Sequence, residues 1–63
     1  MIWNLIQVSA GATVHRGRYR MEGEQLILEW RGGRIAERCG LLKPEFVATA
    51  RLKQLVAQPQ IAA

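Results

Sequence analysis

Residues 19–39 read Tyr-Arg-Met-Glu-Gly-Glu-Gln-Leu-Ile-Leu-Glu-Trp-Arg-Gly-Gly-Arg-Ile-Ala-Glu-Arg-Cys, and this order predicts two consecutive β-hairpins that share a central strand. Gly32-Gly33 predicts a two-residue turn, because such a turn needs positive φ at its central positions and glycine accepts it without steric cost. Glu22-Gly23 predicts a weaker turn, because glutamate is a poor occupant of the first position. Between the turns lies an aliphatic run that ends in tryptophan.

The two turns also predict how the strands align. The expected opposite pairs are Met21 with Glu24, Tyr19 with Leu26, Gly17 with Leu28, His15 with Trp30, Arg31 with Arg34, Trp30 with Ile35, Leu28 with Glu37 and Leu26 with Cys39. Side chains alternate between the faces of a strand, so this alignment separates an apolar face from a polar one. The apolar face is expected to hold Tyr19, Met21, Leu26, Leu28, Trp30, Ile35 and Cys39. The polar face is expected to hold Arg16, Arg18, Arg20, Gln25, Ile27, Glu29, Arg31, Arg34, Ala36 and Arg38.

This separation of faces is the main reason to expect a sheet, because a slip of one residue would mix apolar and polar side chains. Glu37 is the exception on the apolar face, and it is expected at the sheet margin or beside a β-bulge. On the polar face, Arg16, Arg18 and Arg20 stand in a row, about 7 Å apart, because two residues of strand rise separate them. Glu29 is the only acid expected opposite this row, across from Arg16.

The first 14 residues carry no charge and are too short to span a bilayer, which needs about 20 residues. They also lack the Lys or Arg that begins a signal peptide, so neither a membrane span nor a signal is expected. We expect a first strand from Ile2 to Val8, a turn around Ala10-Gly11 and a second strand over residues 13–21. With a two-residue turn, Trp3 falls on the arginine face beside Arg18.

The C-terminal part of the chain predicts one helix, from about Pro44 to Ala57. Proline suits the first helical position because its missing N–H costs nothing there, and Glu45 complements the helix dipole. The apolar stripe expected to lie on the sheet consists of Ala48, Leu52, Leu55 and Val56. A partial second stripe on another side of the helix consists of Phe46, Val47 and Ala50.

Together these elements predict an α+β fold, an antiparallel meander of three or four β-strands with one C-terminal α-helix packed on one face. Residues 1–57 are expected to form a single small domain and residues 58–63 a loose C-terminal tail. A chain of 63 residues buries only roughly 60% of its unfolded surface, so its core is marginal. Small domains of this kind often gain stability by oligomerising.

The sequence does not contain the groups of a catalytic or metal site. One Cys and one His are too few for a closed zinc site, and no Asp is present to orient His15 beside a nucleophile. Cys39 is expected as a small buried hydrophobe rather than a reactive thiol. Glu29 and Glu37 project to opposite faces, so they cannot share a substrate. We therefore expect a non-enzymatic protein without cofactor or metal, and the single Cys fits a reducing, cytoplasmic location.

The charge favours an anionic partner. The net charge is +4, and seven of the nine basic residues are Arg, which grips phosphates and carboxylates bidentately. The first hypothesis is therefore a basic binding domain whose arginine face contacts nucleic acid or another polyanion. Its candidate binding residues are Arg16, Arg18, Arg20, Arg31, Arg34, Arg38 and Trp3. Trp3 would stack on a base or hold Arg18 by a cation–π contact. A solvated charged face, or the Arg-rich usage of a high-GC genome, would explain the same residues without a ligand.

The second hypothesis is a homodimeric protein-interaction module with no nucleic-acid role. One chain of this size has a single helix to cover the sheet, so apolar side chains on the arginine face have no covering layer. The candidate dimer contacts are Trp3, Leu5, Val14, Ile27, Phe46 and Ala50. Both hypotheses use the arginine face, so they compete unless the dimer forms on the helix side.

Overall fold

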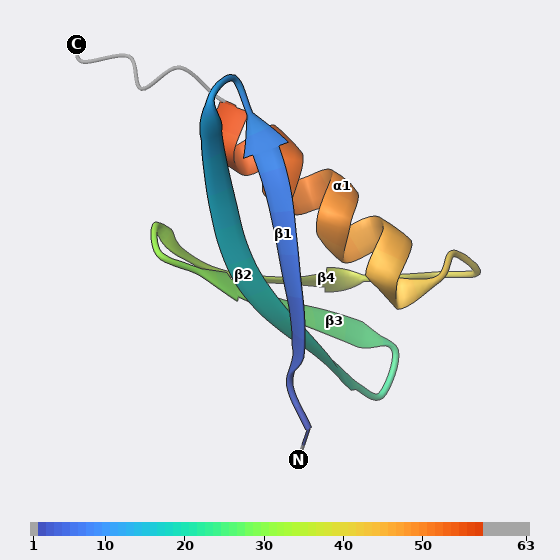
Figure 1. Ribbon diagram of the computed structural model, residues 1–63. Coiled ribbons are helices and arrows are strands. Elements are labelled where there is room, and N and C mark those ends of the chain that lie inside the picture. Colours follow the sequence, from blue (N-terminus) through green and yellow to red (C-terminus); the bar gives the residue numbers. More distant parts are fainter. Residues whose placement is uncertain (1, 58–63) are drawn as a thin grey trace, which may run out of the picture.

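The computed structural model describes residues 2–57 of the chain. The elements, in chain order, are β1 (Asn4–Ala10), β2 (Thr13–Glu22), β3 (Gln25–Trp30), β4 (Gly33–Arg38) and α1 (Pro44–Ala57). The four strands form one antiparallel sheet in the order β1-β2-β3-β4, and α1 lies against one face of it (Figure 1). The predicted α+β meander with one C-terminal helix is confirmed, with four strands. The tail expected over residues 58–63 lies outside the described residues.

Each hairpin turn has two residues, but each lies one position away from the expected turn. The first two turns are Gly11-Ala12 and Gly23-Glu24, rather than Ala10-Gly11 and Glu22-Gly23. In both, glycine takes the leading position, with φ of 63° and 61°, as in a type II′ turn. The expected placement was wrong because it would have required positive φ at alanine or glutamate, where a side chain makes that backbone costly.

The third turn is Arg31-Gly32, not Gly32-Gly33. A Cβ atom at Gly32 would lie 2.6 Å from Nε1 of Trp30, so glycine makes room there for the indole ring. Gly32 does not have positive φ. Gly32 is therefore required by the packing of Trp30, and the Gly-Gly pair does not form the primed turn that the sequence predicted.

Because each turn moved by one residue, each strand pairing moved by two. The observed opposite pairs include Tyr19 with Leu28, Met21 with Leu26, Gly17 with Trp30, Val8 with His15, Leu28 with Ile35 and Leu26 with Glu37. The expected pairs were therefore wrong. A shift of two residues keeps every side chain on its own face of the sheet, so the predicted division into an apolar and a polar face is retained.

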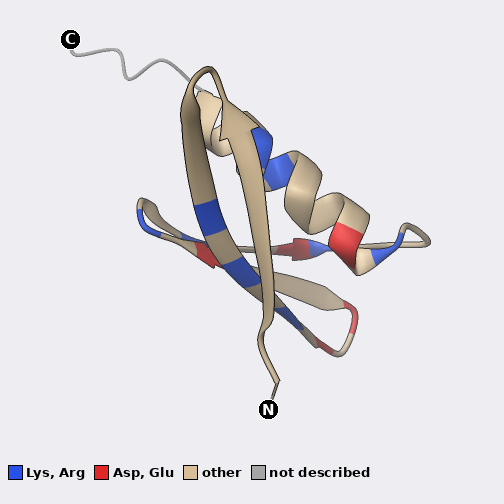
Figure 2. Ribbon diagram, viewed as in Figure 1, with Lys and Arg blue, Asp and Glu red and all other residues tan. Residues whose placement is uncertain are grey.

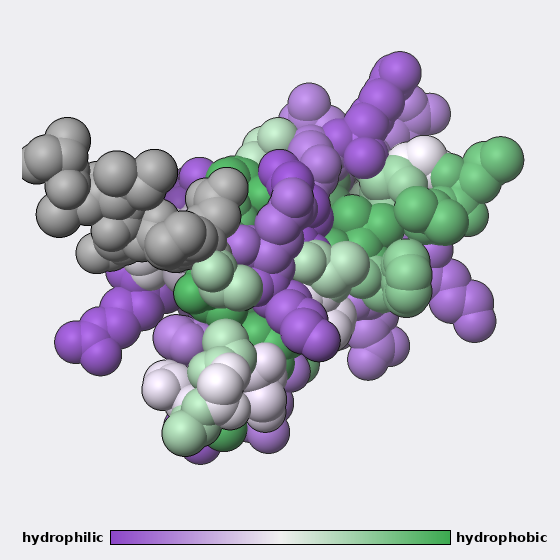
Figure 3. Space-filling model, turned by 90° about the horizontal axis from the view of Figure 1, so that it is seen from above, coloured by the Kyte–Doolittle hydropathy of each residue, from purple (hydrophilic) through white to green (hydrophobic). Residues whose placement is uncertain are grey.

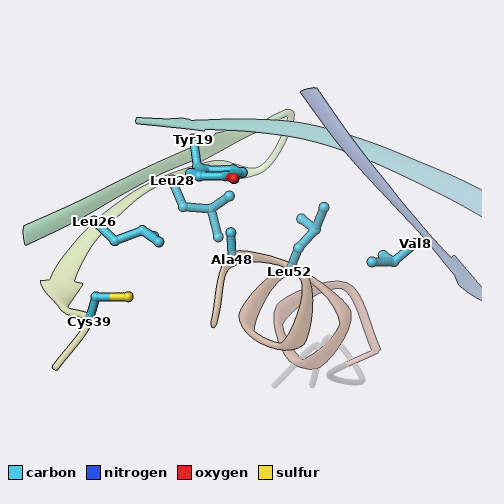
Figure 4. Close-up of a cluster of buried hydrophobic side chains, with 7 residues drawn as sticks. All are labelled: Val8, Tyr19, Leu26, Leu28, Cys39, Ala48 and Leu52. Carbon is cyan, nitrogen blue, oxygen red and sulfur yellow. The ribbon is translucent and has the colours of Figure 1, made fainter. Parts of the chain in front are cut away.

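The core lies between the sheet and α1 (Figure 4). Its buried members are Val8, Tyr19, Leu26, Leu28, Cys39, Ala48 and Leu52. Leu26, Leu28 and Leu52 are completely enclosed, and burying one such side chain contributes about 1.5–3 kcal/mol. The enclosed leucines come from one central strand and one helix, so the core depends on α1 staying docked.

Helix α1 has the predicted bounds. Leu55 and Val56 pack against the margin of the core, and so does Val47 from the second stripe. Phe46 and Ala50 remain exposed. Among the described residues, no helix has the length and apolar character needed to cross a membrane.

The helix comes close to the middle of β2 because a glycine stands there. A Cβ atom at Gly17 would lie 3.0 Å from the carbonyl oxygen of Glu29 and 3.1 Å from Cδ2 of Leu52. The missing side chain therefore lets Leu52 settle almost onto the strand backbone.

The misfit of Glu37 on the apolar face is explained by the helix. Oε1 of Glu37 lies 2.7 Å from Nε of Arg51, and both side chains are only partly exposed. An arginine from α1 thus neutralises the carboxylate at the edge of the core. The pairing of β3 with β4 continues through Glu37 without a break, so no bulge is needed.

Candidate nucleic-acid interface

The sheet face turned away from α1, which we call the open face, carries the arginines of β2. It is made by Leu5, Gln7, Ser9, Arg16, Arg18, Arg20, Ile27, Glu29, Arg34, Ala36 and Arg38. Figure 2 shows basic bands at intervals along β2, with acidic residues on the neighbouring strand. Arg31 stands in the turn between β3 and β4, at one end of this face.

Glu29 binds two of these arginines at once. The guanidinium group of Arg18 donates hydrogen bonds of 3.0 and 2.8 Å to Oε1, and Nε of Arg34 lies 3.2 Å from Oε2. The hydrogen bonding from Arg18 holds the pKa of the Glu29 carboxyl below its usual value of 4.5, with partial burial opposing and the nearby arginine charges reinforcing the effect. The expected partner of Glu29 was Arg16. Arg16 instead stands opposite Gln7 of β1, one residue before Gly17, where the pairing of β2 with β3 ends opposite Trp30.

Two more arginines of the predicted set have acidic partners. Arg20 pairs with Glu22, and Nη2 of Arg38 donates a hydrogen bond of 2.9 Å to Glu24. The Arg38 pair is largely exposed, so water screens it and a phosphate can compete for the guanidinium group.

Arg16 and Arg31 differ from the other members of the set. Within residues 2–57, neither forms an ion pair with an acidic side chain. Both are exposed. Their full positive charge is therefore available to an anion.

Trp3 lies against arginines on the open face. The guanidinium carbon of Arg18 lies 4.1 Å from the centre of the indole ring, and that of Arg20 lies 4.6 Å from it. Trp3 thus holds two arginines by cation–π contacts, where one was expected. The contact fixes the direction of both guanidinium groups and uses ring surface on which a base would otherwise stack.

The candidate dimer contacts are divided among several environments. Leu5 is 84% exposed and Val14 53% exposed, whereas Ile27 is only 7% exposed, between Arg20 and Ala36 on the neighbouring strands. Phe46 is exposed, as are Leu41 and Leu42. Figure 3 shows hydrophobic surface at the end of the molecule that carries the connection from β4 to α1. The predicted contacts therefore do not form a single patch.

Three cavities meet at Arg16, at the end of β2 near the β3–β4 turn. One of about 430 Å³ is also lined by His15, Trp30 and Arg31, and one of about 270 Å³ by Trp30 and Arg18. The third, of about 420 Å³, lies along β1. The sequence interpretation placed Trp30 on the apolar face and Arg16 and Arg31 on the polar face, and it missed this grouping. The signal was present in the spacing of the turn glycines, because β2 has ten residues and β3 only six.

A separate cavity of about 500 Å³ lies beside Cys39, between the β2–β3 turn and the loop before α1. The thiol of Cys39 donates a hydrogen bond of 3.2 Å to the carbonyl oxygen of Leu42, and it is buried. His15 is not part of this lining. Among the described residues, no three His, Cys, Asp or Glu side chains gather as metal ligands.

Comparison with known proteins finds no match for the chain among family models, curated proteins or solved structures. The site therefore rests on its own geometry.

Proposed function

We propose that this chain is a non-enzymatic binding domain that contacts nucleic acid with its open face. The observation that carries the proposal is the charge balance around Glu29. This one carboxylate is shared by Arg18 and Arg34, while Arg16 and Arg31 have no acidic partner in residues 2–57. The face therefore keeps an excess of positive charge after its internal ion pairs have formed.

The type of cation suits the phosphates and bases of nucleic acid. Arginine is planar, binds phosphate bidentately and stacks on aromatic rings. The arginines along β2 repeat about every 7 Å, close to the spacing of successive phosphates in an extended single strand of nucleic acid. Protein surfaces that bind single strands combine such a basic track with aromatic side chains.

Fluorescence anisotropy with a labelled single-stranded oligonucleotide of roughly 16 residues tests the proposal. We expect binding at low salt that weakens roughly 10- to 60-fold between about 50 and 200 mM salt, because a few counterions are released per bound protein. The decisive variant is Arg18→Gln with Arg34→Gln, which should lower the salt slope. A failure to bind any single-stranded or double-stranded probe at about 50 mM salt would refute the proposal.

A second, compatible role is favoured by the edge strand β1. We propose that two copies pair through this strand. Residues 2–10 carry no charge and Leu5 is 84% exposed, whereas edge strands are normally protected by charge, proline or a bulge. Pairing through this edge would leave the open face accessible. Analytical ultracentrifugation should detect a dimer at micromolar concentration that Leu5→Lys dissociates, and a monomer at every concentration would contradict it.

A further inference from the structure

Strand β2 continues past the end of its neighbour and leaves a notch in the sheet. The last pair between β2 and β3 is Gly17 with Trp30, so residues 13–16 pair with β1 alone. In Figure 1 the β1–β2 hairpin rises beyond the β3–β4 pair, beside the C-terminal end of α1. The side of β2 that faces the notch therefore has backbone N–H and C=O groups without a strand partner in the described chain.

The notch brings together side chains from both faces of the sheet, with Arg16 from the open face and His15 and Trp30 from the face that carries the core. The cavity of about 430 Å³ brings together Arg16, Arg31, His15 and Trp30. Arg16 and Arg31 are also the arginines without an ion-pair partner in residues 2–57. The volume falls within the range of small-ligand sites, roughly 300–1,000 Å³.

Trp30 is held in a defined position at this cavity. It packs against the hydrophobic core and lies so close to Gly32 that a Cβ atom there would be 2.6 Å from Nε1. Trp3, in contrast, already lies against Arg18 and Arg20. Trp30 is therefore the better placed of the two indoles to meet a base.

We propose that the notch binds one nucleotide unit of a single-stranded nucleic acid, with its phosphate between Arg16 and Arg31 and its base against Trp30. Those backbone N–H groups of residues 13–16 that point away from β1 and into the notch add donors for the phosphate or the base edge. His15 lines the same cavity and supplies a further ring donor or acceptor. This inference rests on the proposed function, because it assigns one subsite of the nucleic-acid surface.

The test uses the fluorescence of Trp30 in a Trp3→Phe background, in which Trp30 is the only tryptophan. The probe is an unlabelled single-stranded oligonucleotide of roughly 16 residues, and adenosine monophosphate and inorganic phosphate are separate arms. We expect the oligonucleotide to quench the emission, because a stacked base contacts the indole. Inorganic phosphate should leave the emission unchanged.

The charge contribution is tested with two double variants of equal net charge. Arg16→Gln with Arg31→Gln removes the notch arginines, and Lys43→Gln with Lys53→Gln removes two exposed lysines that line none of the three cavities at Arg16. We expect the arginine variant to lose roughly 10-fold in affinity and about 0.7 in salt slope, since the two arginines neutralise one phosphate and each neutralised phosphate contributes about 0.7. The lysine variant should lose clearly less. Circular dichroism confirms that both are folded.

The outcomes separate this inference from the proposed function. Binding seen by anisotropy without quenching of Trp30, or equal losses in the two double variants, would overturn the notch and leave the nucleic-acid function standing. Absence of anisotropy binding at low salt would overturn both. If adenosine monophosphate quenches Trp30 with the same affinity as the oligonucleotide, the notch is a site for free nucleotides. That result would refute its assignment to a nucleic-acid strand.

Discussion

Arg18 and Glu29 stand opposite each other on β2 and β3, and their ion pair lies in the middle of the open face. The same carboxylate also contacts Arg34. A phosphate that approaches either arginine must compete with Glu29 for the guanidinium group. Glu29 is therefore expected to limit the affinity of this face for polyanions while it orders the arginines.

Replacing this carboxylate should strengthen binding. In Glu29→Gln, Arg18 and Arg34 lose their acidic partner, so we expect roughly two- to fivefold tighter binding of a single-stranded oligonucleotide at about 50 mM salt. The salt slope should become steeper, because more phosphates are neutralised. Fluorescence anisotropy over a series of salt concentrations measures both quantities.

The matched control is Glu45→Gln, which changes the net charge equally. Glu45 lies exposed in the first turn of α1, on the opposite side of the sheet from the arginines. A gain of affinity as large as that of Glu29→Gln would mean that total charge, not the local ion pair, controls binding.

The pKa of Glu29 predicts how the stability of the fold depends on pH. The pKa of Glu29 is lower in the folded chain than the usual 4.5, so its ion pairs stabilise the folded state above that pH. This contribution is lost as the pH falls from 4.5 through the lower pKa of the folded state. Thermal unfolding followed by circular dichroism should show a steeper loss of Tm in this acid range for the wild type than for Glu29→Gln. Parallel curves would show that the pairing does not contribute to folding.

The division of the sheet into two faces could be predicted from sequence because it depends only on alternation along each strand. Arg16, Arg18 and Arg20 stay on one face for any register that differs by two residues. The turn positions could not be predicted as reliably: the Gly32-Gly33 pair is typical of a primed turn, but the turn is Arg31-Gly32, where Gly32 makes room for the indole of Trp30.

The ion pairs of the site could not be predicted either, because they depend on where the turns lie. A register shift of two residues replaces every cross-strand neighbour, so Glu29 meets Arg18 rather than Arg16. Because of this shift, Arg16 has no acidic partner within residues 2–57. The notch follows from unequal strand lengths, which appear only when both turns that bound β3 are placed correctly.

Tyr19 provides a second pH prediction. Burial, with smaller effects from the charges of Glu45 and Cys39, raises the pKa of its hydroxyl above 10.0. The folded state therefore holds this proton more tightly than the unfolded state, so stability is present below pH 10.0 and is lost as the pH rises through the folded pKa. The chain has one Tyr, so ultraviolet absorbance of tyrosinate reports this group alone. We expect a higher midpoint in buffer than in denaturant, and equal midpoints would show that the hydroxyl reaches water.

The close contact between β2 and α1 predicts the effect of a single methyl group. In Gly17→Ala, the new Cβ would lie 3.0 Å from the carbonyl oxygen of Glu29 and 3.1 Å from Cδ2 of Leu52. Overpacking of this kind costs about 1–3 kcal/mol, whereas replacing glycine by alanine in an unstrained position gains only about 0.4–1 kcal/mol through the unfolded state. The crowding should win, so urea unfolding should show a lower midpoint for the variant, while the exposed control Ser9→Ala should stay within about 0.5 kcal/mol of the wild type.

A double-mutant cycle with Leu52→Ala identifies the source of that cost. Shortening Leu52 removes the 3.1 Å contact and leaves the one with the carbonyl oxygen, so Gly17→Ala should be less damaging in that background. We expect a coupling energy of about 0.5–3 kcal/mol between the two positions. Strict additivity would instead assign the whole cost to the backbone of β3, and it would mean that the position of α1 does not depend on the glycine in β2.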